Sequence, residues 1–151
     1  MGLVMGIPAE EVTFAPVEGG GDGLDTLARL YRQLTRSHGS AITLDAAREK
    51  LALMLAAGAQ ARLMRHGDRL IGCVTWMDMG DHYFIRNFVI EEMVRGEGLG
   101  AAIVGRLTGG VLADKPVRLE ASNLRSQAFW AAQGFQNWSV GYRFGGPKEA
   151  D

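Results

Sequence analysis

The sequence has few of the residues that form disulfides and metal sites. It contains one cysteine and three histidines in 151 residues. One cysteine excludes an intramolecular disulfide, and Cys73 stands in an apolar, strand-like run, which indicates a buried thiol rather than a nucleophile. The histidines are scattered, and no spacing of histidine and cysteine indicates a metal site. We therefore expect neither a disulfide nor a bound metal.

Long apolar runs and an excess of one charge are also missing. No apolar run is long enough to span a membrane, and the N-terminus lacks the regions of a secretory signal. Lys plus Arg number 16 against 17 Asp plus Glu, so no basic excess indicates a nucleic-acid partner. The length and the hydrophobic content of 47% are typical of one domain with a core. We expect a single cytoplasmic domain over residues 1–151, with a loose leader over 1–10 and no nucleic-acid or membrane partner; a homodimer stays open.

The most informative stretch runs from Phe88 to Val104. An apolar strand pattern ends at Ile90 and is followed by an acidic link, by Arg95 with three nearby glycines, and by a helical pattern from about Leu99. The first amides of a helix have no carbonyl partner within it, and the helix dipole adds partial positive charge there. Glycines allow several N–H groups to converge on one phosphate, and an arginine adds a fixed charge. The pattern predicts an anion-binding loop.

The glycine spacing leaves more than one interpretation. The nucleoside triphosphate P-loop is excluded because its spacing is absent. Gly96, Gly98 and Ala101 satisfy the dinucleotide pattern GxGxxA, with Glu120 as a ribose-binding acid. However, five residues separate Ile90 from Gly96, and little chain follows Glu120 for a second nucleotide-binding half. A nicotinamide-dependent oxidoreductase is thus the less favoured alternative, and an ordinary helix start with tolerated glycines is the plainest one.

Two motifs in order carry a resemblance to a known family. The first is Arg, two residues, Gly, one residue and Gly, formed by Arg95, Gly98 and Gly100. The second is an asparagine, a short helix, an aromatic pair and Gly-Phe, formed by Asn123, Phe129, Trp130, Gly134 and Phe135. Together they resemble the GNAT N-acetyltransferase superfamily, whose coenzyme A diphosphate loop reads Q/RxxGxG/A. The resemblance covers roughly Glu10 to Phe144, nearly the whole chain.

The order of predicted elements agrees with this resemblance. Apolar periodicity predicts strands at 12–17, 61–64, 70–76, 83–90, 116–120 and 135–144, and helices at 24–34, 43–55, 99–112 and 123–133. The last strand region can hold one strand or two. A strand, helix, strand crossover requires parallel neighbours. The GNAT fold implied is an α/β fold: a mixed sheet of six or seven strands, splayed between its central parallel strands and flanked by about four helices.

The resemblance also implies where acetyl-CoA binds. In the family, acetyl-CoA lies between the strand before the loop and the strand before the asparagine helix. Strand residues offer backbone groups to the pantetheine arm, the loop holds the diphosphate, and the asparagine reaches pantetheine from the other side. The residues implied are Phe88, Val89, Ile90, Arg95, Gly96, Glu97, Gly98, Leu99, Gly100, Ala101, Asn123 and Trp130. A role of Asn123 as a helix cap is compatible with this.

The implied chemistry is direct attack of a primary amine, from a small molecule or an exposed protein amine, on the thioester. The family commonly has a tyrosine acid where this chain has Trp130, and an indole is no acid at neutral pH. Glu120 is our candidate for a catalytic base, ahead of His82, Tyr83 and Tyr142, and an ordinary surface or capping role for it is equally open. Because of Trp130, a protein that binds acyl-CoA without catalysis is the main alternative.

Overall fold

The computed structural model describes residues 7–18, 20–37, 39–91, 98–121, 124–138 and 141–144. For residues 137–138 and 141–144 it describes the backbone only. Within these residues one mixed sheet has seven strands in the order β1-β2-β3-β4-β5-β7-β6. The strands are β1 (Thr13–Pro16), β2 (Gln60–His66), β3 (Arg69–Asp78), β4 (Tyr83–Ile90), β5 (Val117–Leu119), β6 (Gln136–Trp138) and β7 (Gly141–Phe144). The helices are η1 (Ala9–Glu11), α1 (Gly21–Ser37), α2 (Leu44–Ala56), α3 (Leu99–Thr108) and α4 (Leu124–Ala132). The predicted fold class is confirmed.

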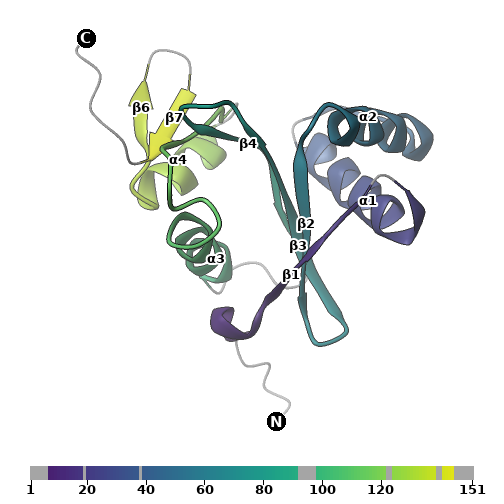
Figure 1. Cartoon of the computed structure of the whole chain (residues 1–151), viewed down its shortest axis with the longest axis horizontal. Helices are drawn as coiled ribbons and strands as arrows, with labels where there is room; N and C mark the ends of the chain where they lie inside the picture. Colours follow the sequence, from purple (N-terminus) through teal and green to yellow (C-terminus); the bar gives the residue numbers. More distant parts are fainter. Residues whose placement is uncertain are drawn as a thin grey trace.

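The helices form two layers on opposite sides of the sheet, with α1 and α2 on one side and α3 and α4 on the other (Figure 1). On the first side, Leu27 and Leu30 of α1 and Leu51 of α2 pack with Val89 of β4 in one buried cluster. On the second side, the buried leucine, isoleucine and valine side chains of α3 and the aromatic residues of α4 pack in another cluster. Each helix follows the apolar spacing of its sequence, because that spacing places one stripe against the sheet.

Helix α3 is shorter than predicted. The sequence pattern extends it to Leu112, but the helix ends at Thr108. Gly109 and Gly110 have low helix propensity, about 1 kcal/mol each relative to alanine. The Leu112 N–H turns back to donate to the Leu107 carbonyl at 2.9 Å, and the Leu112 side chain is buried. Val111, whose spacing had suggested another helical turn, is exposed, and Leu112 fills the core from a turn instead.

Strands β4 and β5 part after a short contact. Their parallel pairing is confined to Tyr83↔Val117 and Phe84↔Arg118. On its other edge β4 pairs antiparallel with β3 along its whole length, from Asp78↔Tyr83 to Gly72↔Ile90. The last residues of β4 therefore have a strand partner on one side, and β5 does not supply one on the other. This is the predicted splay between the central parallel strands.

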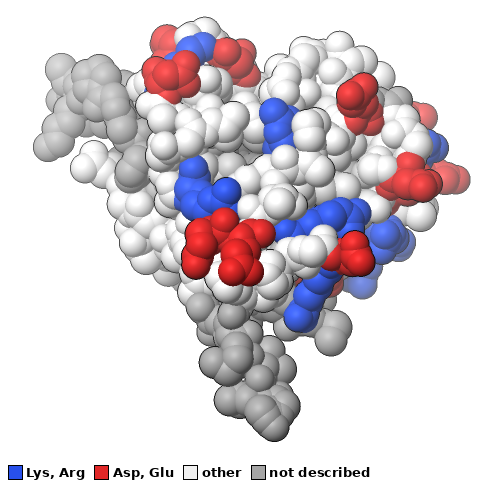
Figure 2. Space-filling view, turned by 60° about the horizontal axis from the view of Figure 1, so that its bottom comes forward, with Lys and Arg blue, Asp and Glu red and all other residues white. Residues whose placement is uncertain are grey.

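Three further properties bear on function. Cys73 is fully buried, and burial raises the pKa of its thiol to about 12, so the thiol is neutral at physiological pH. The prediction of a buried thiol is confirmed. Figure 2 shows Lys and Arg side chains interspersed with Asp and Glu side chains on the face that includes the bottom of Figure 1. The helices in the described part of the chain include no membrane span.

Candidate functional site

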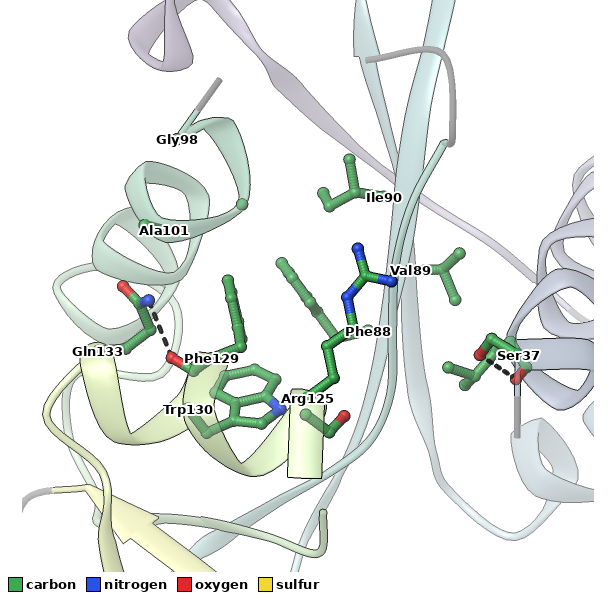
Figure 3. Close-up of a pocket in the computed structure, with 13 residues that line it drawn as sticks. Ser37, Phe88, Val89, Ile90, Gly98, Ala101, Arg125, Phe129, Trp130 and Gln133 are labelled. Carbon is green, nitrogen blue, oxygen red and sulfur yellow. Dashed lines mark hydrogen bonds between the residues drawn. The ribbon is translucent and has the colours of Figure 1, made fainter. Parts of the chain in front are cut away.

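A cavity of about 540 Å³ lies beside the C-terminal end of β4, beyond its short pairing with β5 (Figure 3). Four elements surround it: the end of α1, the end of β4, the start of α3 and one face of α4. Its lining consists of Leu34, Ser37, Phe88, Val89, Ile90, Gly98, Gly100, Ala101, Arg125, Ser126, Phe129, Trp130 and Gln133. The volume is within the range of ligand pockets, about 300–1,000 Å³. The cavity beside the gap between β4 and β5 is thus large enough to hold a ligand.

The start of α3 presents backbone amides at this cavity. Gly98 precedes the helix with φ 74° and ψ 5°, a left-handed conformation that a residue with a Cβ adopts only with strain. The first intrahelical bond runs from the Ala102 N–H to the Gly98 carbonyl at 3.1 Å. The N–H groups of Leu99, Gly100 and Ala101 therefore have no carbonyl partner inside the helix. These amides and the helix dipole favour an anion at this end of the cavity.

An aromatic cluster forms the wall opposite α3. Phe88 of β4 stacks on Phe129 of α4 with ring centroids 6.1 Å apart, and Trp130 meets both rings edge-on at 5.4 and 5.0 Å. A further edge contact at 5.0 Å joins Trp130 to Phe135. Trp130 is only 6% exposed, so most of its surface serves packing. At Gly100 an added Cβ would lie 3.4 Å from the Phe129 ring, which shows how closely α3 approaches this wall.

The C-terminal end of β4 is held in place from β3. An added Cβ at Gly72 would lie 2.0 Å from the Val89 carbonyl oxygen, so only a glycine accommodates β4 at this position. The Glu91 N–H donates to the Ile71 carbonyl at 2.7 Å and continues the pairing beyond the strand. On the α1 side, the Gln33 side-chain amide donates to the Glu91 carboxylate at 3.2 Å. Contacts with β3 and α1 thus hold the end of β4 in position on the side away from α4.

The structure brings most described members of the predicted binding set together. Phe88, Val89, Ile90, Gly98, Gly100, Ala101 and Trp130 line the cavity. Leu99 is 4% exposed and packs in the core, so it can offer only backbone. The predicted positions that lie outside the described residues are Arg95, Gly96, Glu97 and Asn123. Their roles stay predictions.

Several lining residues were not predicted from the sequence. Arg125 and Ser126 of α4 and Gln133, directly after it, line the cavity beside Trp130, and so does Phe129, which the sequence placed in the aromatic motif but not in the binding set. Each of the first three lies three or four residues from Phe129, and this spacing is the signal that could have identified them, because such positions share a helix face. Leu34 and Ser37 of α1 carried no comparable signal, since they reach the cavity from a distant part of the sequence.

The candidate catalytic residues lie outside the cavity lining. Glu120 follows β5 and is exposed, and strand alternation places it on the face opposite the buried Leu119. The Tyr83 hydroxyl donates to the Asp114 carboxylate at 2.7 Å, a bond that raises the pKa of Tyr83. Tyr83 stands at the start of β4, about 23 Å of strand from Ile90. The neighbouring histidine, His82, binds Asp81 at 2.7 Å, and the side chain of Tyr142 lies outside the described structure.

The sequence profile of the Acetyltransferase (GNAT) family matches residues 27–135. The chain belongs to the GNAT acetyltransferase family. Solved structures share its fold at low sequence identity. A Thermus thermophilus acetyltransferase superposes with a TM-score of 0.66 and 19% identity, over 87% of this chain and 92% of its own.

Two streptococcal acetyltransferases have the same GNAT fold. The Streptococcus agalactiae protein gives a TM-score of 0.63 at 16% identity, over 90% of this chain and 93% of its own. The Streptococcus pneumoniae GNAT family protein gives 0.60 at 19% identity, over 83% of this chain and 87% of its own. No curated protein matches the sequence significantly. In the described sheet β4 and β5 pair in parallel, and all the other pairs are antiparallel. A dinucleotide-binding fold has a mostly parallel sheet, so the dinucleotide interpretation of the glycines is not supported.

Proposed function

We propose that this chain is an acetyl-CoA-dependent N-acetyltransferase that acts on the primary amine of a small molecule or of a protein. One observation carries the proposal. A single cavity joins the amides at the start of α3, which have no partner inside the helix, to the part of β4 that lies beyond its pairing with β5, in a member of the GNAT family. A ligand with an anionic group and a peptide-like arm matches these two features, and acetyl-CoA has both.

The residues that would hold acetyl-CoA follow from this arrangement. The amides of Gly100 and Ala101 would receive the diphosphate at the helix N-terminus. The backbone of Phe88 and Ile90 would pair with the amide groups of the pantetheine arm, as an added strand pairs with a sheet edge. The rings of Phe129 and Trp130 would cover the arm from the α4 side. The support is this fit between the cavity and the ligand.

The reaction requires three things of the site. The amine must lose a proton before it attacks, the developing oxyanion needs a hydrogen-bond donor, and the departing sulfur needs a proton or must leave as a thiolate. Trp130 cannot supply that proton, because an indole N–H is not an acid in water. We infer that coenzyme A leaves as the thiolate, and that Glu120 orients or deprotonates the amine on the open side of the gap.

A titration and a rate assay test this function. Isothermal titration with acetyl-CoA, CoA and NAD should give the tightest binding for acetyl-CoA and CoA, and thiol release should follow with part of a broad amine panel. Tight acetyl-CoA binding without turnover on any amine would assign the chain to the non-catalytic class instead. Stronger binding of NAD than of CoA would refute the proposal.

A variant at the start of α3 tests the position of the diphosphate. Gly100→Asp places a carboxylate among the cavity-lining residues, where it would repel the diphosphate. We expect at least a tenfold loss of CoA affinity, about 1.4 kcal/mol, with an unchanged circular dichroism spectrum. Gly105→Ala on the same helix is the control, because its added Cβ meets no atom within 4 Å. Equal CoA affinity in both variants would place the diphosphate elsewhere.

A further inference from the structure

The charge of the cavity is carried by one residue. Among the described residues that line it, Arg125 alone is ionic, and the others are apolar or uncharged. In Figure 3 its side chain leaves the start of α4 and extends toward the Val89–Ile90 end of β4. No hydrogen bond or ion pair joins Arg125 to another described residue. Among the described residues, a guanidinium thus faces a cavity of apolar and uncharged side chains without a carboxylate to balance it.

Two described carboxylates, one directly after β4 and one directly after β5, are engaged or placed elsewhere. Glu91 accepts its hydrogen bond from Gln33 of α1 and does not line the cavity. Glu120 is exposed after β5 and does not line it either. Apolar walls strengthen the attraction of a cation for an anion, since they replace water as the surrounding medium. The arrangement favours a ligand that brings its own negative group.

Acetyl-CoA in the proposed orientation does not provide that group at this position. Its diphosphate would lie at the start of α3, and its third phosphate lies on the adenosine side, still farther from the thioester. The part beside Phe88–Ile90, which Arg125 approaches, would be the pantetheine arm, and that arm is uncharged. The cavity also reaches Leu34 and Ser37 of α1, which leaves room on the side away from α3 for the second reactant.

We propose that Arg125 binds a carboxylate close to the reacting centre, either on the acceptor amine or at the end of the acyl chain. This inference rests on the proposed acyl-CoA-dependent function. The planar guanidinium can donate two parallel hydrogen bonds to a carboxylate, which fixes orientation as well as binding. An amino acid, an amine beside an acidic side chain, and a dicarboxylic acyl group share this chemistry. The substrate that carries the carboxylate would thereby be selected by charge, as aromatic packing alone selects weakly.

Matched ligand pairs test the inference. The first pair is phenylalanine and phenylalaninamide as acceptors with acetyl-CoA, and the second is succinyl-CoA and acetyl-CoA with phenylalaninamide. In each pair, kcat/KM for the ligand with the carboxylate is divided by kcat/KM for the ligand without it. In Arg125→Gln this ratio should be about 10- to 100-fold lower than in wild type for one of the two pairs. The two members of a pair differ in amine pKa, but this difference is the same for wild type and variant, so it cancels when their ratios are compared. Arg125→Lys should recover part of the ratio, and Arg69→Gln, which removes the same charge outside the cavity lining, should leave it unchanged.

Binding measurements make the result independent of turnover. Titration of N-acetylphenylalanine and its amide into the CoA complex, and of succinyl-CoA and acetyl-CoA into the free protein, should show the same Arg125-dependent preference for a carboxylate. The inference would be overturned if Arg125→Gln left these preferences unchanged. It would also be overturned if the variant lost affinity for CoA but not for dephospho-CoA, because Arg125 would then bind the third phosphate of CoA. Wild-type binding of acetyl-CoA and acetylation of the amide would leave the proposed function standing in that case. Failure of wild type to bind any acyl-CoA would instead refute the function and this inference together.

Discussion

A single methyl group added to β3 should disturb the candidate site, because β3 supports the end of β4 that lines it. In Gly72→Ala, the added Cβ would lie 2.0 Å from the Val89 oxygen, 3.0 Å from the Val89 carbonyl carbon and 3.1 Å from the Ile90 Cα. Side-chain Cβ atoms do not approach other heavy atoms closer than 3.0 Å. The two strands must therefore separate by at least 1.0 Å, the difference between 3.0 Å and 2.0 Å. The atoms met are backbone, so no side chain can rotate away.

The size of the effect follows from what moves. Overpacking that displaces backbone costs about 1–3 kcal/mol, which in a chain of this length lowers the melting temperature by roughly 2–12 °C. The displaced residues, Val89 and Ile90, also line the cavity. A misplacement of about 1 Å at a reacting centre can cost about 100-fold in rate. We expect Gly72→Ala to lose both stability, measured by thermal denaturation, and kcat/KM, measured by thiol release with acetyl-CoA.

Gly105→Ala is the matched control for this experiment. Its Cβ meets no atom within 4 Å, and the position lies inside α3. Alanine there should raise stability by about 0.5–1 kcal/mol because it favours the helix. Activity is compared at a temperature where circular dichroism shows both variants fully folded. A Gly72→Ala protein with wild-type stability and wild-type kcat/KM would show that β4 does not depend on the close approach at this glycine.

Three further predictions concern single side chains. Trp130→Phe should change turnover only by a modest factor, and the rate should rise with pH without a falling alkaline limb, since no phenol supplies a proton; a bell-shaped profile would contradict this. Arg106 donates from one guanidinium nitrogen to two carbonyls of the N-terminal segment at 2.6 Å each, so Arg106→Gln should lower the free energy of unfolding in urea by about 1–2 kcal/mol. The raised pKa of Tyr83, caused by its bond to Asp114, means that the folded state holds the phenol proton more tightly. The stability difference between wild type and Tyr83→Phe should thus be constant below about pH 9 and shrink above about pH 10, and a difference that persists at high pH would contradict it.

Local sequence patterns predict the start of the site well. The strand that ends at Ile90 and the helix that begins at Leu99 both occur as predicted, because apolar periodicity and an amide-rich helix start are encoded within a few residues. The aromatic motif on α4 was identified for the same reason, and Trp130 lines the cavity. These features depend on neighbours in the chain, which a single sequence displays directly.

Features that depend on distant contacts were not predictable. Gly72 reads as an ordinary glycine in a strand pattern, and only the position of Val89 on the neighbouring strand shows why it cannot carry a side chain. Ser37 reads as part of a polar turn, yet it reaches the cavity from α1. Arg125 resembles any exposed charge near a helix start. In each case the function depends on a partner that packing, rather than sequence distance, brings near.

The two cores explain how the end of β4 can stay ordered where β5 no longer pairs with it. Val89 is 2% exposed and packs in the α1–α2 cluster, whereas Phe88 and Ile90 pack against the α3–α4 cluster. Alternate residues of β4 are therefore anchored in opposite layers, and β3 holds its other edge through to Gly72. A strand fixed on three sides presents its fourth side in one conformation. A ligand that pairs with this edge need not order the protein backbone, so more of its interaction free energy remains for affinity and for positioning its reacting group.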